Sequence, residues 1–276
     1  MEEYVFMDSL LKNALLYSLL PATAILVGGL ISTVRVLPPG LVGAIENFAA
    51  GAVFSVFAIE LLTDILFAHP SAGIIAFTSG IAFIIGVKWL TGKLSLSYDE
   101  SAKSLTALVC NAGINILIAG LLIGSGFVAG VSEGQLLIAA LTPLALATVL
   151  TLVAALQFLK IQRETSIFIS IILAVLLVLS TATGSFLLSE RAGFDLDIVL
   201  TFTQAVLLVS ALESLANVRD DWNPLWSLSL FFGGVILFMI IGNYLGKRHS
   251  NHPGRKEKTQ SSNHLNVARK KYGTFT

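Results

Sequence analysis

The sequence predicts an all-α integral membrane protein that crosses the bilayer eight times. Of its 276 residues, 55% are hydrophobic and only 12% are charged, about half the charged fraction that is usual for soluble domains. The mean hydropathy of +0.84 points the same way. Charge-free runs recur along the chain, and a helix of roughly 20 apolar residues crosses the ~30 Å hydrocarbon core. Helices are favoured because lipid cannot satisfy backbone N–H and C=O groups.

Charged residues mark the boundaries of the predicted spans. Six stretches contain no Asp, Glu, Lys or Arg and predict one span each, at residues 13–34, 65–87, 104–132, 134–159, 165–189 and 222–246. Two further spans, at about 48–66 and about 198–217, are equally apolar overall but carry acidic residues. Short links containing proline separate neighbouring spans, at Pro38-Pro39-Gly40, His69-Pro70 and Asn223-Pro224.

The membrane-spanning part is expected to occupy residues 1–246, and residues 247–276 form a polar, basic tail that we expect to be disordered. The 17 basic residues balance the 17 acidic ones, so the composition does not point to a nucleic-acid partner. The single cysteine, Cys110, excludes an internal disulfide. The sequence contains no Walker A or Rossmann pattern, so we expect no enzymatic activity and no resident cofactor.

A weak internal repeat links the two spans that carry acidic residues. Six residues of the segment 52–62 recur in the segment 205–215, each 153 residues later, and Glu60 then corresponds to Glu213. With a slip of one residue, Gly80 corresponds to Gly234. The first three spans and the last three spans would form two corresponding units. Because a unit of three crosses the membrane an odd number of times, the second unit would be inverted relative to the first. The predicted arrangement is therefore 3+2+3 with inverted repeats, which is typical of secondary transporters.

At this level of detail the sequence resembles the ZIP (Zrt/Irt-like) family of divalent metal transporters. The segment 48–54, Phe-Ala-Ala-Gly-Ala-Val-Phe, is similar to the glycine-bearing opening of the family's second span, and 120–124, Gly-Leu-Leu-Ile-Gly, is similar to the end of its fourth-span metal motif. The resemblance covers residues ~14–246. It implies a fold in which the fourth and fifth spans line the metal path, with both termini outside the cytoplasm.

The sequence departs from the family where metal ligands are expected. The family's fourth span reads close to His-Asn-x-x-Glu-Gly, which places Asn115 at the histidine and Ala119 at the glutamate. The surroundings of Pro143 in the fifth span contain no carboxylate or imidazole. Zinc prefers nitrogen, thiolate and carboxylate ligands. These spans therefore predict either low-affinity, poorly discriminating transport of divalent cations or a preference for a harder ion such as Mn²⁺ or Mg²⁺.

The candidate metal ligands are the polar residues that remain within the spans. They form three pairs, each four residues apart and so on one helix face: Glu60 and Asp64, Asn111 and Asn115, and Glu213 and Asn217. Carboxylates at bilayer depth usually face a bundle interior or a wet cavity. Asp64 can instead lie near the interface and face water, and the asparagines can instead serve as packing glue between helices.

Two classes of function follow from these residues. The first is a ZIP-like transporter of a divalent cation with low affinity or altered selectivity. The second is a membrane protein that keeps the fold without transporting, and acts as a partner in a membrane complex. The expected partners are the lipid bilayer, a small cation and a second copy in a homodimer. A continuous polar path from Glu60 to Glu213 past the asparagines would favour transport.

The distribution of Lys and Arg predicts the orientation. With the N-terminus outside, the cytoplasmic loops hold seven basic residues and the outer loops two, in agreement with the positive-inside rule. The tail adds eight basic residues on the outer side, but long terminal segments count less. We therefore expect a multi-pass protein of the plasma membrane with both termini outside the cytoplasm.

Overall fold

A computed structural model describes residues 2–35, 37–67, 70–94, 100–189, 194–216 and 224–250. At several helix ends, including 2–10, 59–67, 213–216 and 245–250, the description covers the backbone alone. These residues form eight helices, in the order α1 (Glu2–Val34), α2 (Pro39–Phe67), α3 (Pro70–Leu94), α4 (Glu100–Ala129), α5 (Val131–Phe158), α6 (Arg163–Ser189), α7 (Phe194–Ala216) and α8 (Pro224–Ser250). The predicted all-α fold is confirmed for this part of the chain.

Seven of the described helices are long and apolar enough to cross a membrane, as a multi-pass membrane protein requires. Their apolar stretches are Leu11–Val34, Gly40–Ala58, Ser71–Leu90, Leu105–Ala129, Val131–Phe158, Arg163–Leu188 and Leu225–Tyr244. The span predicted at 198–217 coincides with α7, whose described apolar stretch is shorter, Ile198–Leu212.

Proline residues begin three of the helices, as the predicted links require. Pro39, Pro70 and Pro224 are the first residues of α2, α3 and α8. Proline suits this position because its fixed φ matches the helix and its missing N–H would have no partner in the first turn. Since α2 begins at Pro39, its described apolar stretch starts at Gly40, ahead of the predicted start at about 48, and the helix continues to Phe67.

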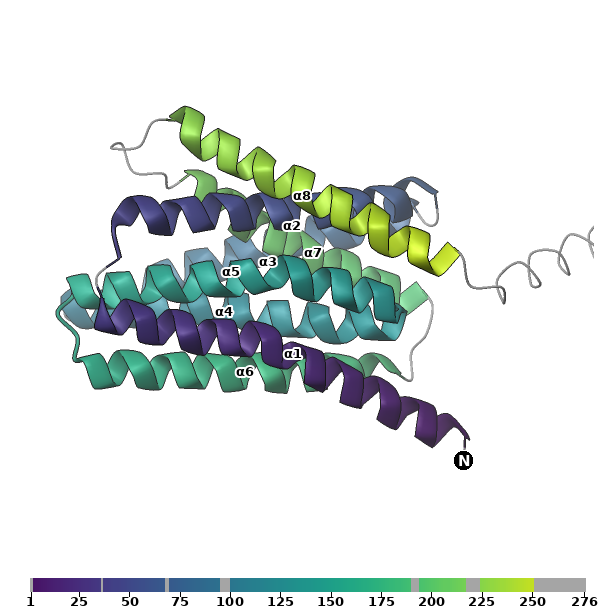
Figure 1. Ribbon diagram of the computed structural model, residues 1–276, viewed down its shortest axis with the longest axis horizontal. Coiled ribbons are helices and arrows are strands. Elements are labelled where there is room, and N and C mark those ends of the chain that lie inside the picture. The colour runs from purple at the N-terminus through teal and green to yellow at the C-terminus, as the bar shows by residue number, and fades with distance from the viewer. Residues whose placement is uncertain are drawn as a thin grey trace, which may run out of the picture.

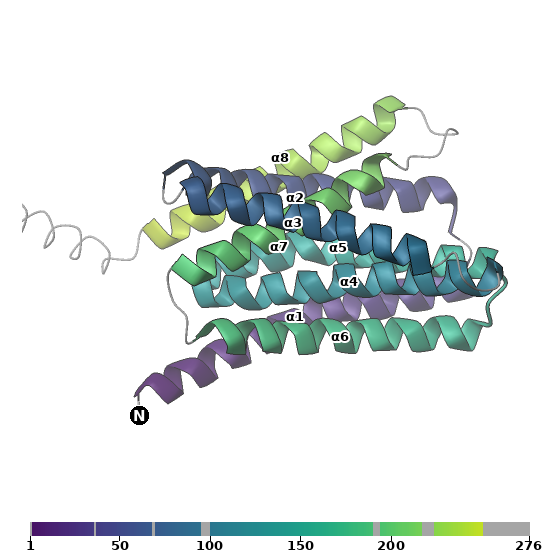
Figure 2. The same cartoon turned by 180° about the vertical axis from the view of Figure 1, so that it is seen from behind.

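The helices pack as two layers of four. One layer runs α1, α5, α2, α8 (Figure 1), and the other runs α6, α4, α7, α3, as seen from behind in Figure 2. Neighbours within each layer pack together along this order. Between the layers, α1 packs on α6, α5 on α4, and α2 on α7. The four helices α2, α4, α5 and α7 therefore occupy the centre of the bundle.

The first residues of α1 and the last residues of α8 lie at the same end of the bundle (Figure 1). Helix α8 continues to Ser250, past the predicted domain boundary at residue 246. The remainder of the predicted tail, residues 251–276, lies outside the described residues.

Close approach of α2 and α8 depends on two glycines. A Cβ atom added to Gly51 would lie 2.9 Å from the carbonyl carbon of Phe231 and still closer to its oxygen. A Cβ added to Gly234 would lie 3.1 Å from the backbone nitrogen of Ala52. Both obstacles are backbone atoms, which cannot turn aside as a side chain can. Glycine therefore permits this helix crossing, as small residues commonly do between membrane helices.

Candidate functional site

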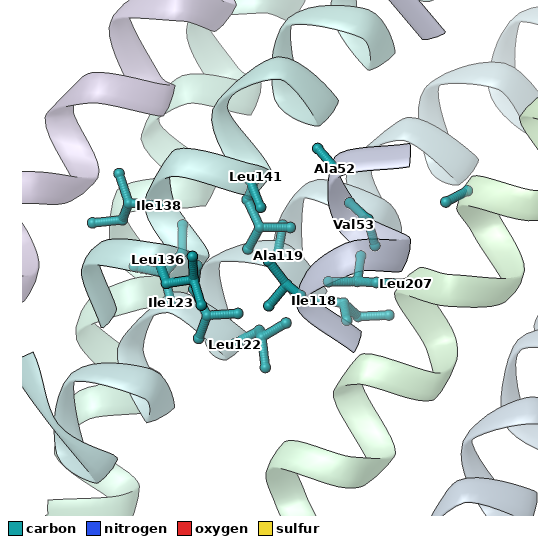
Figure 3. Close-up of a cluster of buried hydrophobic side chains, with 14 of the residues drawn as sticks. Ala52, Val53, Ile118, Ala119, Leu122, Ile123, Leu136, Ile138, Leu141 and Leu207 are labelled. Carbon is teal, nitrogen blue, oxygen red and sulfur yellow. The ribbon is translucent and has the colours of Figure 1, made fainter. Parts of the chain in front are cut away.

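The centre of the bundle is filled by apolar side chains. Figure 3 shows part of this central cluster, in which Val53 of α2, Ile118 of α4, Leu141 of α5 and Leu207 of α7 converge. All four are at most 6% exposed. The cluster extends into the outer helices through residues such as Phe238 of α8. The ZIP resemblance predicts a metal path lined by the fourth and fifth spans, and the corresponding helices α4 and α5 meet here in an apolar cluster.

The position that the ZIP resemblance assigns to a metal-binding glutamate lies inside this cluster. Ala119 is 3% exposed and packs among apolar neighbours (Figure 3). Within the described residues, no group of three or more His, Cys, Asp or Glu side chains could hold a metal ion. Apart from Glu133 at the start of α5 and the thiol of Cys110, the described side chains of α4 and α5 offer a cation only neutral oxygens.

Asn115, which aligns with the family's histidine, is held by the neighbouring helix. Its side-chain oxygen accepts a hydrogen bond of 3.0 Å from the hydroxyl of Ser210 on α7. Asn111, one turn earlier on α4, is exposed. The amide of Asn115 thus connects α4 to α7, which is the packing role that the sequence left open beside a ligand role.

The predicted acidic ligands lie beyond what the structure describes in atomic detail. Glu60, Asp64 and Glu213 belong to described helix backbones, but their side chains lie outside the described residues. Asn217 lies outside them altogether. Glu60 is near the C-terminal end of α2 and Glu213 near that of α7, and the two helices run in opposite directions (Figures 1 and 2). Their backbone positions therefore fall toward opposite ends of the bundle.

Sequence reasoning missed a second polar contact between central helices. Glu46 lies in the apolar stretch Gly40–Ala58 of α2, and its carboxylate accepts a hydrogen bond from the hydroxyl of Thr151 on α5. The span predicted at about 48–66 begins after Glu46 and leaves this carboxylate outside it. The signal that could have placed it correctly is Pro39, because a helix that begins there carries Glu46 two turns inside.

Several other hydroxyl groups of the central and neighbouring helices donate hydrogen bonds to backbone carbonyl oxygens. Thr142 and Thr148 of α5 donate to the carbonyl oxygens of Ile138 and Leu144, at 2.7 and 2.9 Å, so their hydroxyls are occupied within the helix. Ser185 of α6 donates to a carbonyl oxygen of α4, at a close crossing of these two helices. Near the end of α5, Gln157 donates to the carbonyl oxygen of Ser32 on α1.

The long apolar helices and their two-layer packing place the chain in the class of multi-pass membrane proteins. Comparison with known protein families finds no family model that matches the chain, and no curated protein matches it.

Proposed function

We propose that the chain is a ZIP-like transporter of divalent cations, built from eight membrane crossings in a 3+2+3 arrangement with inverted repeats. The packing of the helices is the observation that carries this proposal. Suppose that α1, α2, α3 and α4 correspond to α6, α7, α8 and α5, in that order. When each helix is replaced by its counterpart, every pair of neighbours within one layer becomes a pair of neighbours within the other layer. The three pairs that join the layers are unchanged by this exchange. An approximate twofold relation of this kind is expected of an inverted repeat.

Individual residues support the same relation. Gly80 of α3 faces α7, where an added Cβ would lie 2.9 Å from the Cβ of Ala205. Gly234 of α8 faces α2, where an added Cβ would lie 3.1 Å from the nitrogen of Ala52. The repeat found in the sequence pairs Gly80 with Gly234 and Ala52 with Ala205. Residues that correspond in sequence therefore make corresponding contacts on the two sides of the bundle.

The choice of a cation follows from the polar groups that the central helices carry. Glu46, Glu60 and Glu213 place carboxylates within or at the ends of two central helices. Asn111 and Asn115 add amide oxygens on a third. Oxygen ligands suit hard ions such as Mn²⁺ and Mg²⁺, and a site without imidazole or thiolate binds Zn²⁺ poorly. In this proposal the apolar central cluster is the closed barrier of one state in an alternating-access cycle.

The same apolar cluster favours a second candidate function. A protein that keeps this fold without transporting, and acts as a partner in a membrane complex, would have no need of a polar path through its centre. Its central helices would remain packed as they are here, because buried apolar contacts stabilise one arrangement. The two candidates differ in whether the central cluster ever opens.

Uptake by reconstituted protein tests the proposal. Purified protein in liposomes is supplied separately with Mn²⁺, Mg²⁺, Ca²⁺ and Zn²⁺, and protein-free liposomes provide the background. Glu133→Gln is the matched control, since Glu133 is an exposed carboxylate that bonds Ser132 at the start of α5. The proposal expects saturable uptake of Mn²⁺ or Mg²⁺, weaker uptake of Zn²⁺, and no change in the control. Background-level uptake of every ion would favour the non-transporting partner.

The proposal includes the setting in which the transporter works. It places the protein in the plasma membrane with both termini outside the cytoplasm, in agreement with the distribution of basic residues in the loops. It also includes a homodimer as the working form. Cross-linking in native membranes, followed by the mass of the product, tests the dimer.

A further inference from the structure

Glu46 is the only charged residue between Gly40 and Ala58, the apolar stretch of α2. It lies about two turns inside the helix that begins at Pro39. Within the described residues no basic side chain forms an ion pair with it. An ionisable residue at this depth is costly and usually pairs with another group or faces a water-filled path. Its place in the membrane therefore makes Glu46 a candidate functional residue.

The partner that Glu46 does have is a neutral hydroxyl on another central helix. Thr151 of α5 donates its proton to the carboxylate across the seam between α2 and α5. Thr151 is exposed at the surface of the bundle and Glu46 is half-buried, so the pair lies at the border of the seam and not in the apolar core. A hydroxyl carries one proton and two lone pairs. Rotation about the threonine side chain can therefore present an oxygen lone pair in place of the proton.

The next residue of α2, Asn47, is also polar, and its side chain has no hydrogen-bond partner within the described residues. Asn47 is 1% exposed, and neither its side-chain oxygen nor its nitrogen makes a hydrogen bond within the described residues. Among these residues it is the only side chain with two buried atoms left unsatisfied in this way. Buried polar groups are normally satisfied, and an exception calls for an explanation. Asn47 is the next residue along α2, about 100° around the helix from Glu46.

We propose that Glu46 and Thr151 form a cation-binding step of the transport path, located toward the opposite end of α2 from Glu60, with Asn47 as an adjoining polar group. The inference rests on the proposed transport function. In the closed state the hydroxyl of Thr151 donates to the carboxylate. When a hard divalent cation arrives, the hydroxyl turns, and the cation binds the carboxylate and the hydroxyl oxygen together. When the cation binds, the hydroxyl proton leaves the space between the two oxygens, and the cation replaces the hydrogen bond as the link between α2 and α5.

The experiment measures Mn²⁺ uptake in liposomes and the shift in thermal midpoint that Mn²⁺ causes in the purified protein. The variants are Glu46→Gln, which removes the charge, Thr151→Val, which removes the hydroxyl at equal size, and Asn47→Leu. Thr148→Val is the matched control, because the hydroxyl of Thr148 lies on the same helix but bonds the carbonyl oxygen of Leu144.

We expect Glu46→Gln to raise the KM for Mn²⁺ by at least about tenfold, since it removes a unit charge next to the ion. Thr151→Val is expected to raise it by roughly tenfold or less, because a neutral ligand is lost. Thr148→Val should match the wild type. If Asn47 belongs to the binding step, Asn47→Leu should lower uptake without lowering the thermal midpoint. If Asn47 has only a structural role, leucine removes its unsatisfied polar atoms and uptake should stay at the wild-type level.

The outcomes separate this inference from the proposed function. If the wild type takes up Mn²⁺ and both Glu46→Gln and Thr151→Val keep its KM, the binding step is wrong while the transport function stands. If the wild type takes up neither Mn²⁺ nor any other divalent ion tested, the transport function fails. In that case a Mn²⁺-induced rise in thermal midpoint that Glu46→Gln abolishes still supports a cation site, and the lack of any rise in the wild type overturns it. Should Glu46→Gln fail to fold, Glu46→Asp keeps the charge and should retain Mn²⁺ binding with a shifted KM.

Discussion

Replacing Gly234 by alanine tests whether the crossing of α2 and α8 is as tight as it is described. The added Cβ would lie 3.1 Å from the nitrogen of Ala52 and 3.2 Å from the carbonyl carbon of Phe48. Unstrained contacts between such atoms lie near 3.5–4.0 Å, so the two helices must separate by roughly 0.5 Å or more. Overpacking of this kind costs about 1–3 kcal/mol, and the better helix propensity of alanine returns about 0.5–1 kcal/mol.

The neighbouring glycine provides the control. A Cβ added to Gly233 meets nothing within 4 Å, so Gly233→Ala should gain helix propensity without a clash. Thermal unfolding of the purified protein measures both variants. At about 2–4 °C per kcal/mol, Gly234→Ala should lower the midpoint by roughly 1–8 °C, and Gly233→Ala should leave it unchanged or raise it slightly. A midpoint for Gly234→Ala equal to or above that of Gly233→Ala would refute the reasoning.

Three further predictions concern the polar residues and the topology. Glu60→Gln and Glu213→Gln should each reduce Mn²⁺ uptake while abundance in the membrane stays at the wild-type level, because each removes a charge that is costly in lipid. Uptake and immunoblotting of the same membranes check this, and full uptake in both variants would count against their role as ligands. Ser210→Ala should lower the thermal midpoint by a few degrees or less, since hydrogen bonds between membrane helices contribute about 0.6–1.7 kcal/mol and the oxygen of Asn115 loses its partner. A cysteine placed at Ser261 in a cysteine-free background should react with an impermeant reagent in intact cells, and protection there would contradict the outside location of the tail.

The positions of the helices could be predicted from the sequence because charge is expensive in lipid. Charge-free runs locate six of the helices, and the prolines at 39, 70 and 224 mark the starts of three. The same rule misplaced the start of α2. The predicted span begins after Glu46, since a single carboxylate in an apolar run looks the same in sequence whether it ends a span or lies within one.

The contacts of the polar residues could be predicted much less well. The sequence places Asn115 on a helix face, but its bond to Ser210 joins residues 95 positions apart and depends on how α4 packs against α7. The pairing of Glu46 with Thr151 spans 105 positions. Periodicity within one helix carries no information about which neighbour that helix will have. Ala119 carries no ligating atom, which the sequence alone shows, whereas its burial in a closed apolar cluster emerges only from the packing of four helices.

The apolar cluster at the centre of the bundle also determines how well the protein insulates the membrane electrically. An ion that entered this layer would lose its hydration shell among side chains such as Val53, Leu141 and Leu207, which offer no dipole in return. Hydrophobic constrictions exclude water as well, so a chain of water molecules that could conduct protons is also interrupted. In the described arrangement the protein should therefore add no measurable conductance to a planar bilayer, and the membrane potential can be maintained across it without leak.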